Sequence, residues 1–305
     1  MLHRGTDSQR RQSVGTEKMT LTTTAQLLSD AVVAGRGVAA FNVITLESAE
    51  AIVAGAESAG RPVILQLSEN AVKFHHHQVR PLAAALRELA AASKVSVSLH
   101  LDHVEDEGLL RQSADAGFGS VMFDGGRLPY DANVDATARA TAWAHERGLS
   151  VEAELGYVGG KDSQVTSAHA PGTRTDPQQA ADFVAATGVD ALAVAVGSSH
   201  AMTSRTAALD LGLIDQLQRA VPVPLVLHGS SGVPDDVLAG AVRAGMTKVN
   251  VGTLLNVAYT TSVRQSLAAN PGATDPRPYL AAAREKISAA VAQLVVVIDR
   301  GPDQH

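Results

Sequence analysis

The sequence predicts an α/β fold: a (β/α)8 TIM barrel followed by an additional C-terminal helix. From residue 38 onward, short apolar runs alternate regularly with Ala-rich helical stretches. Many of these runs are apolar throughout, as expected for parallel strands that are covered on both faces. Several helical stretches also end in a glycine, where a helix C-cap needs a left-handed residue. These glycines are Gly60, Gly117, Gly148, Gly188 and Gly245.

The strands and helices are assigned in order along the chain. The expected strands cover residues 38–43, 63–67, 95–101, 120–123, 150–155, 191–196, 225–227 and 248–251. The expected helices cover residues 46–59, 79–93, 105–116, 132–147, 176–187, 210–220, 234–244 and 254–268, and a last helical stretch covers 277–299. Eight strand–helix units over ~230 residues suit a barrel, whose usual size is roughly 250 residues. A doubly wound sheet is the alternative, but its usual glycine fingerprint after the first strand is replaced here by Asn42-Val-Ile-Thr.

The chain is expected to consist of a short tail and one domain. Residues 1–18 are polar and carry several arginines. Such a segment buries too little apolar surface to become ordered, so we predict a disordered tail, with Met19 as an alternative start. Residues 19–305 are predicted to form a single barrel domain with a C-terminal helical extension.

Composition excludes several classes of function. The chain has 305 residues, of which 45% are hydrophobic, so it can bury a large core. A net charge of −6 and the lack of a dense basic stretch after residue 18 argue against a nucleic-acid partner. The absence of cysteine excludes disulfides, thiolate metal ligands and cysteine nucleophiles. No signal peptide or bilayer-spanning run is visible, so we expect a cytoplasmic enzyme with no membrane partner.

Three histidines stand at the ends of expected strands: His103, His200 and His228. The carboxyl ends of barrel strands carry the catalytic groups of TIM barrels, so we expect the three side chains to converge at the barrel mouth. A single histidine at a strand end is more often structural, but three at one level of a barrel favour a site. Three neutral imidazoles with one open position are typical of catalytic zinc.

Carboxylates accompany these histidines. Asp102 precedes His103, and it is either a general acid/base, a group that orients a ligand histidine, or an N-cap of the next helix. Glu154 ends the fifth strand and Asp124 ends the fourth, which leaves room for a second cation or an alternative position of the first. Glu152 shares a face with Glu154, and inward carboxylates need a cation or a donor.

Three loops are candidates for binding substrate. The turns Gly229-Ser-Ser-Gly and Asn250-Val-Gly-Thr follow the seventh and eighth strands, where barrels usually bind phosphate with backbone N–H groups. The polar loop over residues 159–172 has glycines at its ends and resembles a lid, with Asp162 at its acidic tip as a possible general base. An ordinary solvated loop is the alternative.

Together these segments resemble the class II, metal-dependent fructose-bisphosphate aldolase family, including its tagatose-bisphosphate branch. The matching segments occur in the same order over about residues 38–255. They include Ala40-Phe-Asn, Leu101-Asp-His, Glu154-Leu-Gly-Tyr-Val-Gly-Gly, Gly197-Ser-Ser-His, Pro224-Leu-Val-Leu-His-Gly-Ser-Ser-Gly and Lys248-Val-Asn-Val-Gly-Thr.

The resemblance implies an enzyme that reversibly cleaves a ketose (bis)phosphate, such as fructose 1,6-bisphosphate, into dihydroxyacetone phosphate and an aldehyde. It implies that catalytic Zn²⁺ binds the three strand-end histidines, with a second divalent cation position at Glu154 and Asp124 and a further monovalent cation. Asp102 would be the acid/base at the cleaved alcohol, and Asp162 would exchange the proton on the ketone carbon. The implied substrate contacts are Ser68, Gly197, Gly229, Ser231, Asn250, Gly252 and Thr253. A homodimer or homotetramer is also implied.

The chain departs from the family at several positions. Ala201 stands where the family has glycine, and Thr203-Ser-Arg replaces the usual lysine. Gly252 stands where fructose-type members carry aspartate, and Asn256 replaces a basic residue that binds the far phosphate. The loop acid Asp162 is shorter by one methylene than the family's glutamate. We therefore hypothesise an acceptor aldehyde other than glyceraldehyde 3-phosphate.

Other functions remain open at this point. A tagatose-bisphosphate or other ketose-phosphate aldolase, and a phosphosugar-binding barrel without activity, are both alternatives. A metal-dependent hydrolase is disfavoured because the first strand ends in Phe41-Asn-Val, without a His-x-His pair. A Schiff-base mechanism is disfavoured because Lys248, the one lysine in an expected strand, lies deeper than the mouth.

Overall fold

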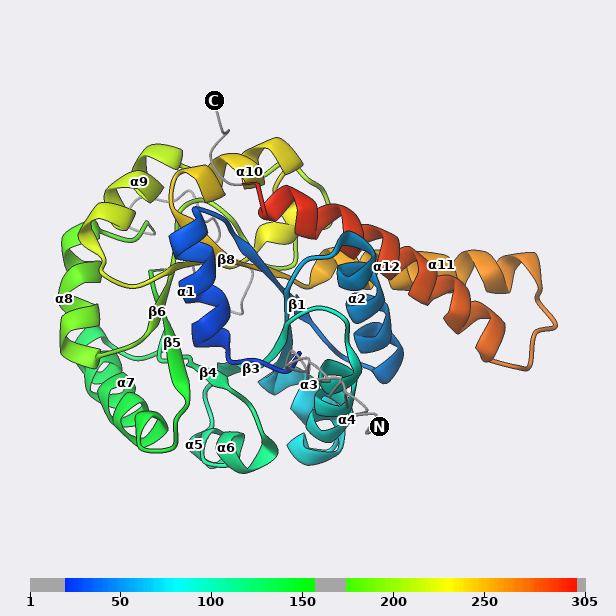
Figure 1. Ribbon diagram of the computed structural model, residues 1–305, viewed down its shortest axis with the longest axis horizontal. Coiled ribbons are helices and arrows are strands. Elements are labelled where there is room, and N and C mark those ends of the chain that lie inside the picture. The colour runs from blue at the N-terminus through cyan, green and yellow to red at the C-terminus, as the bar shows by residue number, and fades with distance from the viewer. Residues whose placement is uncertain (1–19, 157–173, 301–305) are drawn as a thin grey trace, which may run out of the picture.

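The computed structural model describes residues 20–156 and 174–300. Eight parallel strands form a closed barrel in the order β1 to β8, and helices surround it (Figure 1), which confirms the predicted (β/α)8 barrel. The strands are β1 Val38–Asn42, β2 Val63–Ser68, β3 Val97–Val104, β4 Ser120–Phe123, β5 Ser150–Leu155, β6 Ala191–Val194, β7 Leu225–Leu227 and β8 Met246–Val251. The predicted tail over residues 1–18 and the loop acid Asp162 lie outside the described residues.

The helices follow the predicted alternation with some additions. They are α1 Thr24–Ala34, α2 Leu46–Ala59, α3 Glu69–Phe74, α4 Val79–Ala92, α5 Glu107–Leu110, α6 Ser113–Ala116, α7 Tyr130–His145, α8 Pro177–Thr187, α9 Leu211–Ala220, α10 Asp235–Arg243, α11 Thr253–Ala269 and α12 Arg277–Ile298. Where one helix was expected over 105–116, the chain forms the two short helices α5 and α6. The helices α1 and α3 were not predicted.

Helix α1 covers the amino-terminal end of the barrel. Its side chains Leu27, Leu28 and Ala31 form an apolar cluster with inward-facing strand residues such as Ile64 and Val226, and Figure 1 shows α1 lying across the barrel. The Thr23 side chain caps its first turn, and Gly35 ends it with a left-handed φ of 62°. Helix α1 therefore packs across this end of the barrel.

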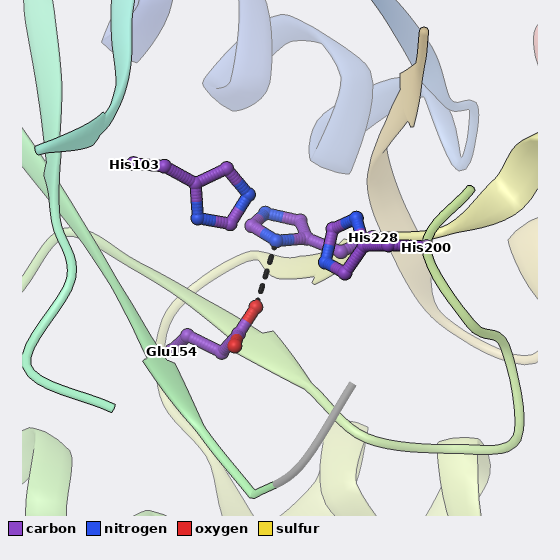
Figure 2. A group of neighbouring side chains, drawn as sticks. All are labelled: His103, Glu154, His200 and His228. Atoms are coloured by element: carbon purple, nitrogen blue, oxygen red, sulfur yellow. Dashed lines mark ion pairs between the residues drawn. The ribbon is translucent and has the colours of Figure 1, made fainter. Parts of the chain in front are cut away.

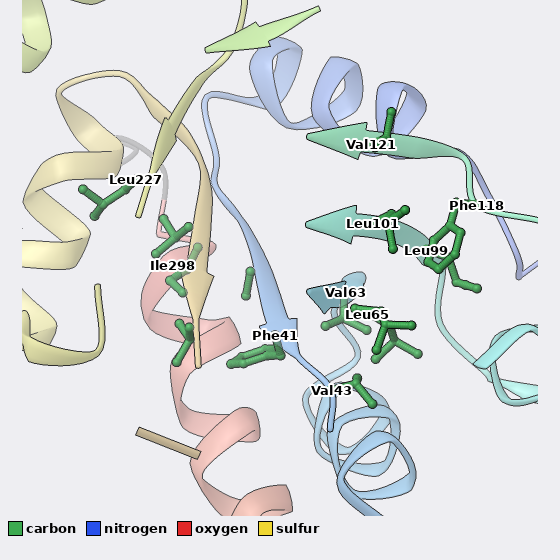
Figure 3. Packing of buried hydrophobic residues seen from close by; sticks show 14 of the residues in the cluster. Phe41, Val43, Val63, Leu65, Leu99, Leu101, Phe118, Val121, Leu227 and Ile298 are labelled. Atoms are coloured by element: carbon green, nitrogen blue, oxygen red, sulfur yellow. The ribbon is translucent and has the colours of Figure 1, made fainter. Parts of the chain in front are cut away.

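The main core lies between the strands and the surrounding helices. It includes Phe41, Leu65, Leu99 and Leu101, which point outward from the barrel (Figure 3) and are buried. Each strand alternates its side chains between this outer core and the barrel interior. The interior positions nearer the carboxyl end are polar or charged, and several are fully buried: Gln66, His100, Asp102, Glu152 and Lys248.

The last two helices form a hairpin that extends away from the barrel (Figure 1). Helix α12 packs against α2 and α11. At Gly55 of α2, a Cβ atom would lie 2.5 Å from the backbone oxygen of Ser288, so only glycine permits this close approach of the two helices. The additional C-terminal helix that the sequence predicts is therefore α12, and it is packed on the barrel at its far end through buried residues such as Ile298.

Candidate active site

Four side chains meet at the carboxyl-terminal mouth of the barrel (Figure 2). His103, Glu154, His200 and His228 each offer one ligand atom, and these atoms all lie within 4.8 Å of one another. His103 belongs to β3 and Glu154 to β5, while His200 and His228 follow β6 and β7. The structure thus brings together the three predicted histidines and the predicted glutamate. Three imidazoles and a carboxylate are a donor set that suits a tetrahedral metal such as Zn²⁺.

An irregularity in β3 lets neighbouring residues reach the same site. The register between β3 and β4 shifts between Leu101 and Val104, and His103 has a left-handed φ of 50°. Adjacent residues of a regular strand face opposite sides. The irregularity removes that restriction, so Asp102 and His103 both line one cavity.

The turns that carry His200 and His228 lie against each other. A Cβ atom on Gly229 would lie 2.6 Å from the backbone carbon of Ser199, and Gly229 has a φ of 65°. Glycine is therefore required at this position. Ala201 also has a left-handed φ, of 59°. That conformation accounts for the glycine that the family resemblance implies there, and alanine adopts it at a cost of roughly 1 kcal/mol.

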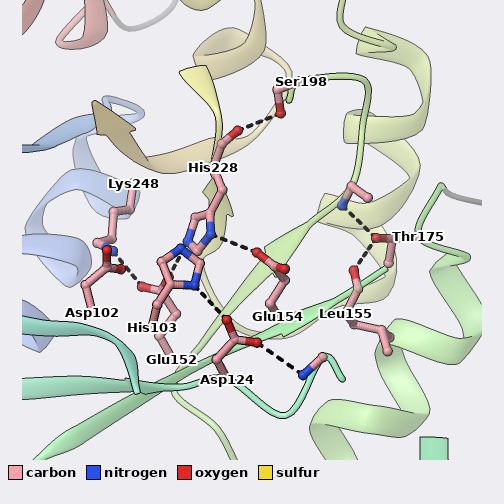
Figure 4. A network of polar contacts seen from close by, with 12 residues as sticks. Asp102, His103, Asp124, Glu152, Glu154, Leu155, Thr175, Ser198, His228 and Lys248 are labelled. Atoms are coloured by element: carbon pink, nitrogen blue, oxygen red, sulfur yellow. Dashed lines mark hydrogen bonds and ion pairs between the residues drawn. The ribbon is translucent and has the colours of Figure 1, made fainter. Parts of the chain in front are cut away.

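His228 is held between two glutamates (Figure 4). Its Nε2 donates to Glu152 at 2.8 Å, and its Nδ1 lies 2.8 Å from Glu154. Burial lowers the pKa of His228, but the hydrogen bonds to Glu152 and Glu154 outweigh burial and raise the pKa to about 9. In the metal-free protein His228 is therefore protonated, and its Nδ1 proton lies between His228 and Glu154. The same position favours a metal cation.

A buried ion pair supports His228 from below. Lys248 Nζ donates to Glu152 at 2.7 Å, and both side chains are almost entirely buried. Burial raises the pKa of Glu152, but the positive charge of Lys248 and the hydrogen bond from His228 lower it far below its ordinary value. Because Lys248 is ion-paired inside the barrel, its amine is not placed for attack on a substrate carbonyl.

Asp124 lies behind His103. Its Oδ2 accepts from His103 Nδ1 at 2.8 Å, and its other oxygen accepts from the backbone N–H of Gly126 at 3.1 Å. This contact orients the imidazole and leaves its second nitrogen for a metal. The structure thus places Asp124 next to the group of four rather than within it.

Asp102 is buried beside the group of four and is held by a chain of amides. Asn42 donates to Asp102 at 3.1 Å, and Gln66 donates to Asn42 at 3.0 Å. Burial raises the pKa of Asp102, but positive charge at His103 and Lys248 lowers it to about 2. Asp102 is therefore ionised at neutral pH and can accept a proton from a substrate hydroxyl.

A cavity of about 510 Å³ covers this site. Most of the predicted substrate-binding residues line it: Ser68, Gly229, Ser231, Asn250, Gly252 and Thr253. Gly197 is not among its lining residues; a Cβ there would lie 2.5 Å from the oxygen of Ala208, so this glycine serves close packing. At Gly252 a Cβ would lie 2.9 Å from Asn42 Oδ1. An aspartate at position 252 would thus displace the side-chain amide of Asn42, which donates a hydrogen bond to Asp102.

The turns after β7 and β8 form a polar corner of the cavity. The Ser230 hydroxyl donates to the backbone oxygen of Asn250, and Ser231 Oγ accepts from the backbone N–H of Leu254 at 3.2 Å. Helix α11 begins at Thr253 beside this corner. A helix N-terminus with small hydroxyl residues around it favours a phosphate group.

Several lining residues were not predicted from the sequence. Asn42, Glu69, Asn70, Lys73 and Arg127 all face the same cavity. Glu69, Asn70 and Lys73 lie in the unpredicted helix α3, and Arg127 lies in the loop after β4. Asn42 ends β1 and so stands at a strand end like the histidines, whereas the other four lie in a short helix and a loop whose positions the strand pattern does not predict.

A parallel barrel with polar groups gathered at its carboxyl-terminal mouth is the architecture of TIM-barrel enzymes, and the three imidazoles and the carboxylate here could hold a metal ion. The sequence matches the family model described as fructose-bisphosphate aldolase class-II over residues 22–300. The chain therefore belongs to the class II fructose-bisphosphate aldolase family and is an aldolase, a carbon–carbon lyase.

Solved structures of aldolases share this fold. The YdjI aldolase from Escherichia coli K12 is 28% identical with a TM-score of 0.80, over 93% of this chain and all (100%) of that one. A putative fructose-1,6-bisphosphate aldolase from Coccidioides immitis is 28% identical with a TM-score of 0.77, over 91% and 96% of the two chains. The fructose-bisphosphate aldolase of Campylobacter jejuni is 21% identical with a TM-score of 0.79, over 93% and 97%, and shows the likeness of fold.

Among the residues that the structure describes, no helix combines the length and the apolar character needed to cross a bilayer.

Proposed function

We propose that the protein is a zinc-dependent aldolase that cleaves a ketose phosphate into dihydroxyacetone phosphate and an aldehyde. The observation that carries this proposal is the convergence of His103, Glu154, His200 and His228 within 4.8 Å. When bound there, zinc supplies a Lewis acid that stabilises the negative charge left on the ketone fragment.

The residues around the group of four have separate roles in this proposal. Asp102 accepts the proton of the hydroxyl at the cleaved bond, since it is ionised and lines the cavity. Gly229, Ser231, Asn250 and Thr253 bind the phosphate of the dihydroxyacetone phosphate half. Asp162 exchanges the proton on the ketone carbon.

Further parts of the proposal concern cations and assembly. Asp124, next to His103, contributes with Glu154 to the position of a second divalent cation, and a monovalent cation assists phosphate binding.

We further propose a homodimer or homotetramer, in which the projecting α11–α12 hairpin contacts another protomer. Light scattering of the purified protein checks the oligomer.

Cleavage of ketose phosphates tests the proposal. Fructose 1,6-bisphosphate, tagatose 1,6-bisphosphate and fructose 1-phosphate are supplied in turn, and the released dihydroxyacetone phosphate is measured. We expect release from at least one of them, with loss of both release and bound zinc in His103→Ala. A zinc-loaded wild-type protein that cleaves none of them contradicts the proposal. A large preference in kcat/KM for fructose 1,6-bisphosphate would show that the acceptor is glyceraldehyde 3-phosphate after all.

A further inference from the structure

Four charged residues form a cluster on one wall of the cavity, above β2, β3 and β4. Within this β2–β4 charge cluster, Lys73 lies 2.6 Å from Glu69, and Arg127 lies 3.3 Å from Glu105. All four residues line the same cavity as His103 and His200. None of them belongs to the metal group or to the phosphate corner described above.

The cluster faces the phosphate corner across the barrel. In a closed ring of eight strands in sequence order, β4 lies opposite β8, and β2 lies opposite β6, the neighbour of β7. The phosphate corner follows β7 and β8, whereas Lys73 follows β2 and Arg127 follows β4. A substrate whose phosphate occupies that corner and whose reacting carbons lie at the group of four therefore extends its other end toward the cluster.

Glu69 fixes the cluster in place and leaves Lys73 with capacity to bind. One oxygen of Glu69 accepts from the backbone N–H groups of Glu105 and Asp106, at 2.7 and 3.0 Å, and the other oxygen contacts Lys73. The Glu69 side chain is 8% exposed, whereas that of Lys73 is 49% exposed. An ammonium group has three donors, so Lys73 keeps donors for a ligand while Glu69 anchors it.

Arg127 is the more exposed of the two cations. Its side chain is 70% exposed, and its partner Glu105 is 40% exposed. Ion pairs this exposed contribute little to stability, so exchanging Glu105 for a ligand anion costs little. A guanidinium also binds phosphate and carboxylate with paired hydrogen bonds.

Asn256 is neutral and therefore supplies no positive charge to this cavity. Asn256 lines the cavity and stands where the resemblance places a basic residue for the far phosphate. If the far end of the substrate is anionic, its countercharge has to come from another part of the cavity wall.

We propose that Lys73 and Arg127 bind an anionic group, phosphate or carboxylate, at the end of the acceptor aldehyde that lies away from the new carbon–carbon bond. This inference rests on the proposed aldolase function and adds the chemical class of the acceptor. Selectivity for an anionic acceptor thus comes from the β2–β4 side of the barrel.

The test is aldol addition, in which the hydroxymethyl carbon of dihydroxyacetone phosphate loses a proton and forms a bond to the aldehyde carbon, while the aldehyde oxygen takes up a proton. Three acceptors are compared: glyceraldehyde 3-phosphate, succinic semialdehyde as a carboxylate, and neutral glyceraldehyde. The readout is kcat/KM for each anionic acceptor divided by kcat/KM for glyceraldehyde. We expect this ratio to exceed one for at least one anion, and to fall about tenfold in Lys73→Met and in Arg127→Met.

Two further variants serve as controls. Arg219 is 72% exposed and paired with Asp215 on α9, so Arg219→Met removes a similar surface arginine outside this cavity and should keep the ratio. Lys73→Arg keeps the charge and should retain most of the ratio. Because Lys73→Met also removes a partner of the buried Glu69, Arg127→Met gives an independent result if the lysine variant fails to fold.

The outcomes separate this inference from the proposed function. A ratio that falls for phosphate alone or for carboxylate alone supports the inference and identifies the anion. A wild-type protein that adds neutral and anionic aldehydes equally well, or a ratio that Arg127→Met leaves unchanged, overturns the inference while the aldolase function stands. No product from any of the three aldehydes contradicts the function itself, and the inference with it.

Discussion

At the scale of single residues, the metal group depends on a layer of charged side chains beneath it. Glu152 contacts both His228 and Lys248, at 2.8 and 2.7 Å. By accepting from Nε2, Glu152 fixes which nitrogen of His228 faces the metal position. We therefore regard Glu152 and Lys248 as positioning residues for the metal site.

The variant Glu152→Gln tests this role. Its amide can no longer serve as a charged acceptor for His228, so zinc should bind about 10–100-fold more weakly. Competition with a chromogenic zinc chelator measures the affinity directly, without reference to catalysis. Glu88→Gln, at an exposed position of α4, should bind zinc as tightly as the wild type. Equal affinities for the two variants would be evidence against a positioning role.

Acid should destabilise the metal-free protein through the same layer. The pKa of Asp102 is about 2, below its ordinary value of 3.8, and that of Glu152 is also lowered. A carboxyl whose folded pKa is lowered contributes stability above its unfolded pKa, and this contribution is lost as the pH falls. For Asp102 alone the loss is on the order of 2 kcal/mol between about pH 5 and pH 2.

Urea unfolding at a series of pH values measures this loss. The decline should be smaller in Asp102→Asn, which has no carboxyl to titrate at that position. An identical decline in the variant and the wild type would show that Asp102 is not the group responsible.

The strand-end histidines could be predicted from sequence because a barrel places every strand end at the same mouth. His103, His200 and His228 each follow an apolar run, and the structure brings them together. The pairing of Glu152 with Lys248 could not be predicted, because it joins β5 to β8 across the barrel interior. The cations Lys73 and Arg127 were missed because Lys73 lies in the short helix α3, which was not predicted, and Arg127 lies in the loop after β4.

At the scale of secondary-structure elements, the strands were predicted closely and the short helices were not. Strands in this barrel are buried on both faces and therefore stand out as apolar runs. Helix α3 and the pair α5 and α6 have only four to six residues each, too few to show a helical period. The strand that was expected over 95–101 runs over Val97–Val104 in the structure. The prediction stopped early because the polar residues Asp102 and His103 interrupt the apolar run.

Helix α1 should stabilise the barrel by closing its amino-terminal end. Leu28 is 5% exposed and packs in the interior cluster, whereas Val33 on the same helix is 87% exposed. We expect Leu28→Ala to lower the free energy of unfolding by about 2–5 kcal/mol and Val33→Ala by less than about 0.5 kcal/mol. Chemical denaturation of both variants measures the difference. If the two variants are equally stable, α1 does not seal the barrel.

At the scale of the whole molecule, the barrel separates stability from chemistry. The amino-terminal end is covered by α1 and its apolar side chains, and the carboxyl-terminal mouth holds the group of four, Asp102 and the cavity described above. The closed order of strands sets the phosphate corner opposite the β2–β4 charge cluster. The fold and the family could therefore be predicted from the sequence. The residues proposed to bind the far end of the substrate could be identified only from the structure.

We propose that the four-residue group at the mouth binds the zinc on which cleavage depends. The most direct test measures zinc content and ketose-phosphate cleavage in one preparation, before and after treatment with a chelator and again after zinc is returned. We predict about one zinc per chain, loss of cleavage when the zinc is removed, and recovery when it is restored. Full cleavage by protein shown to contain no metal would contradict the account.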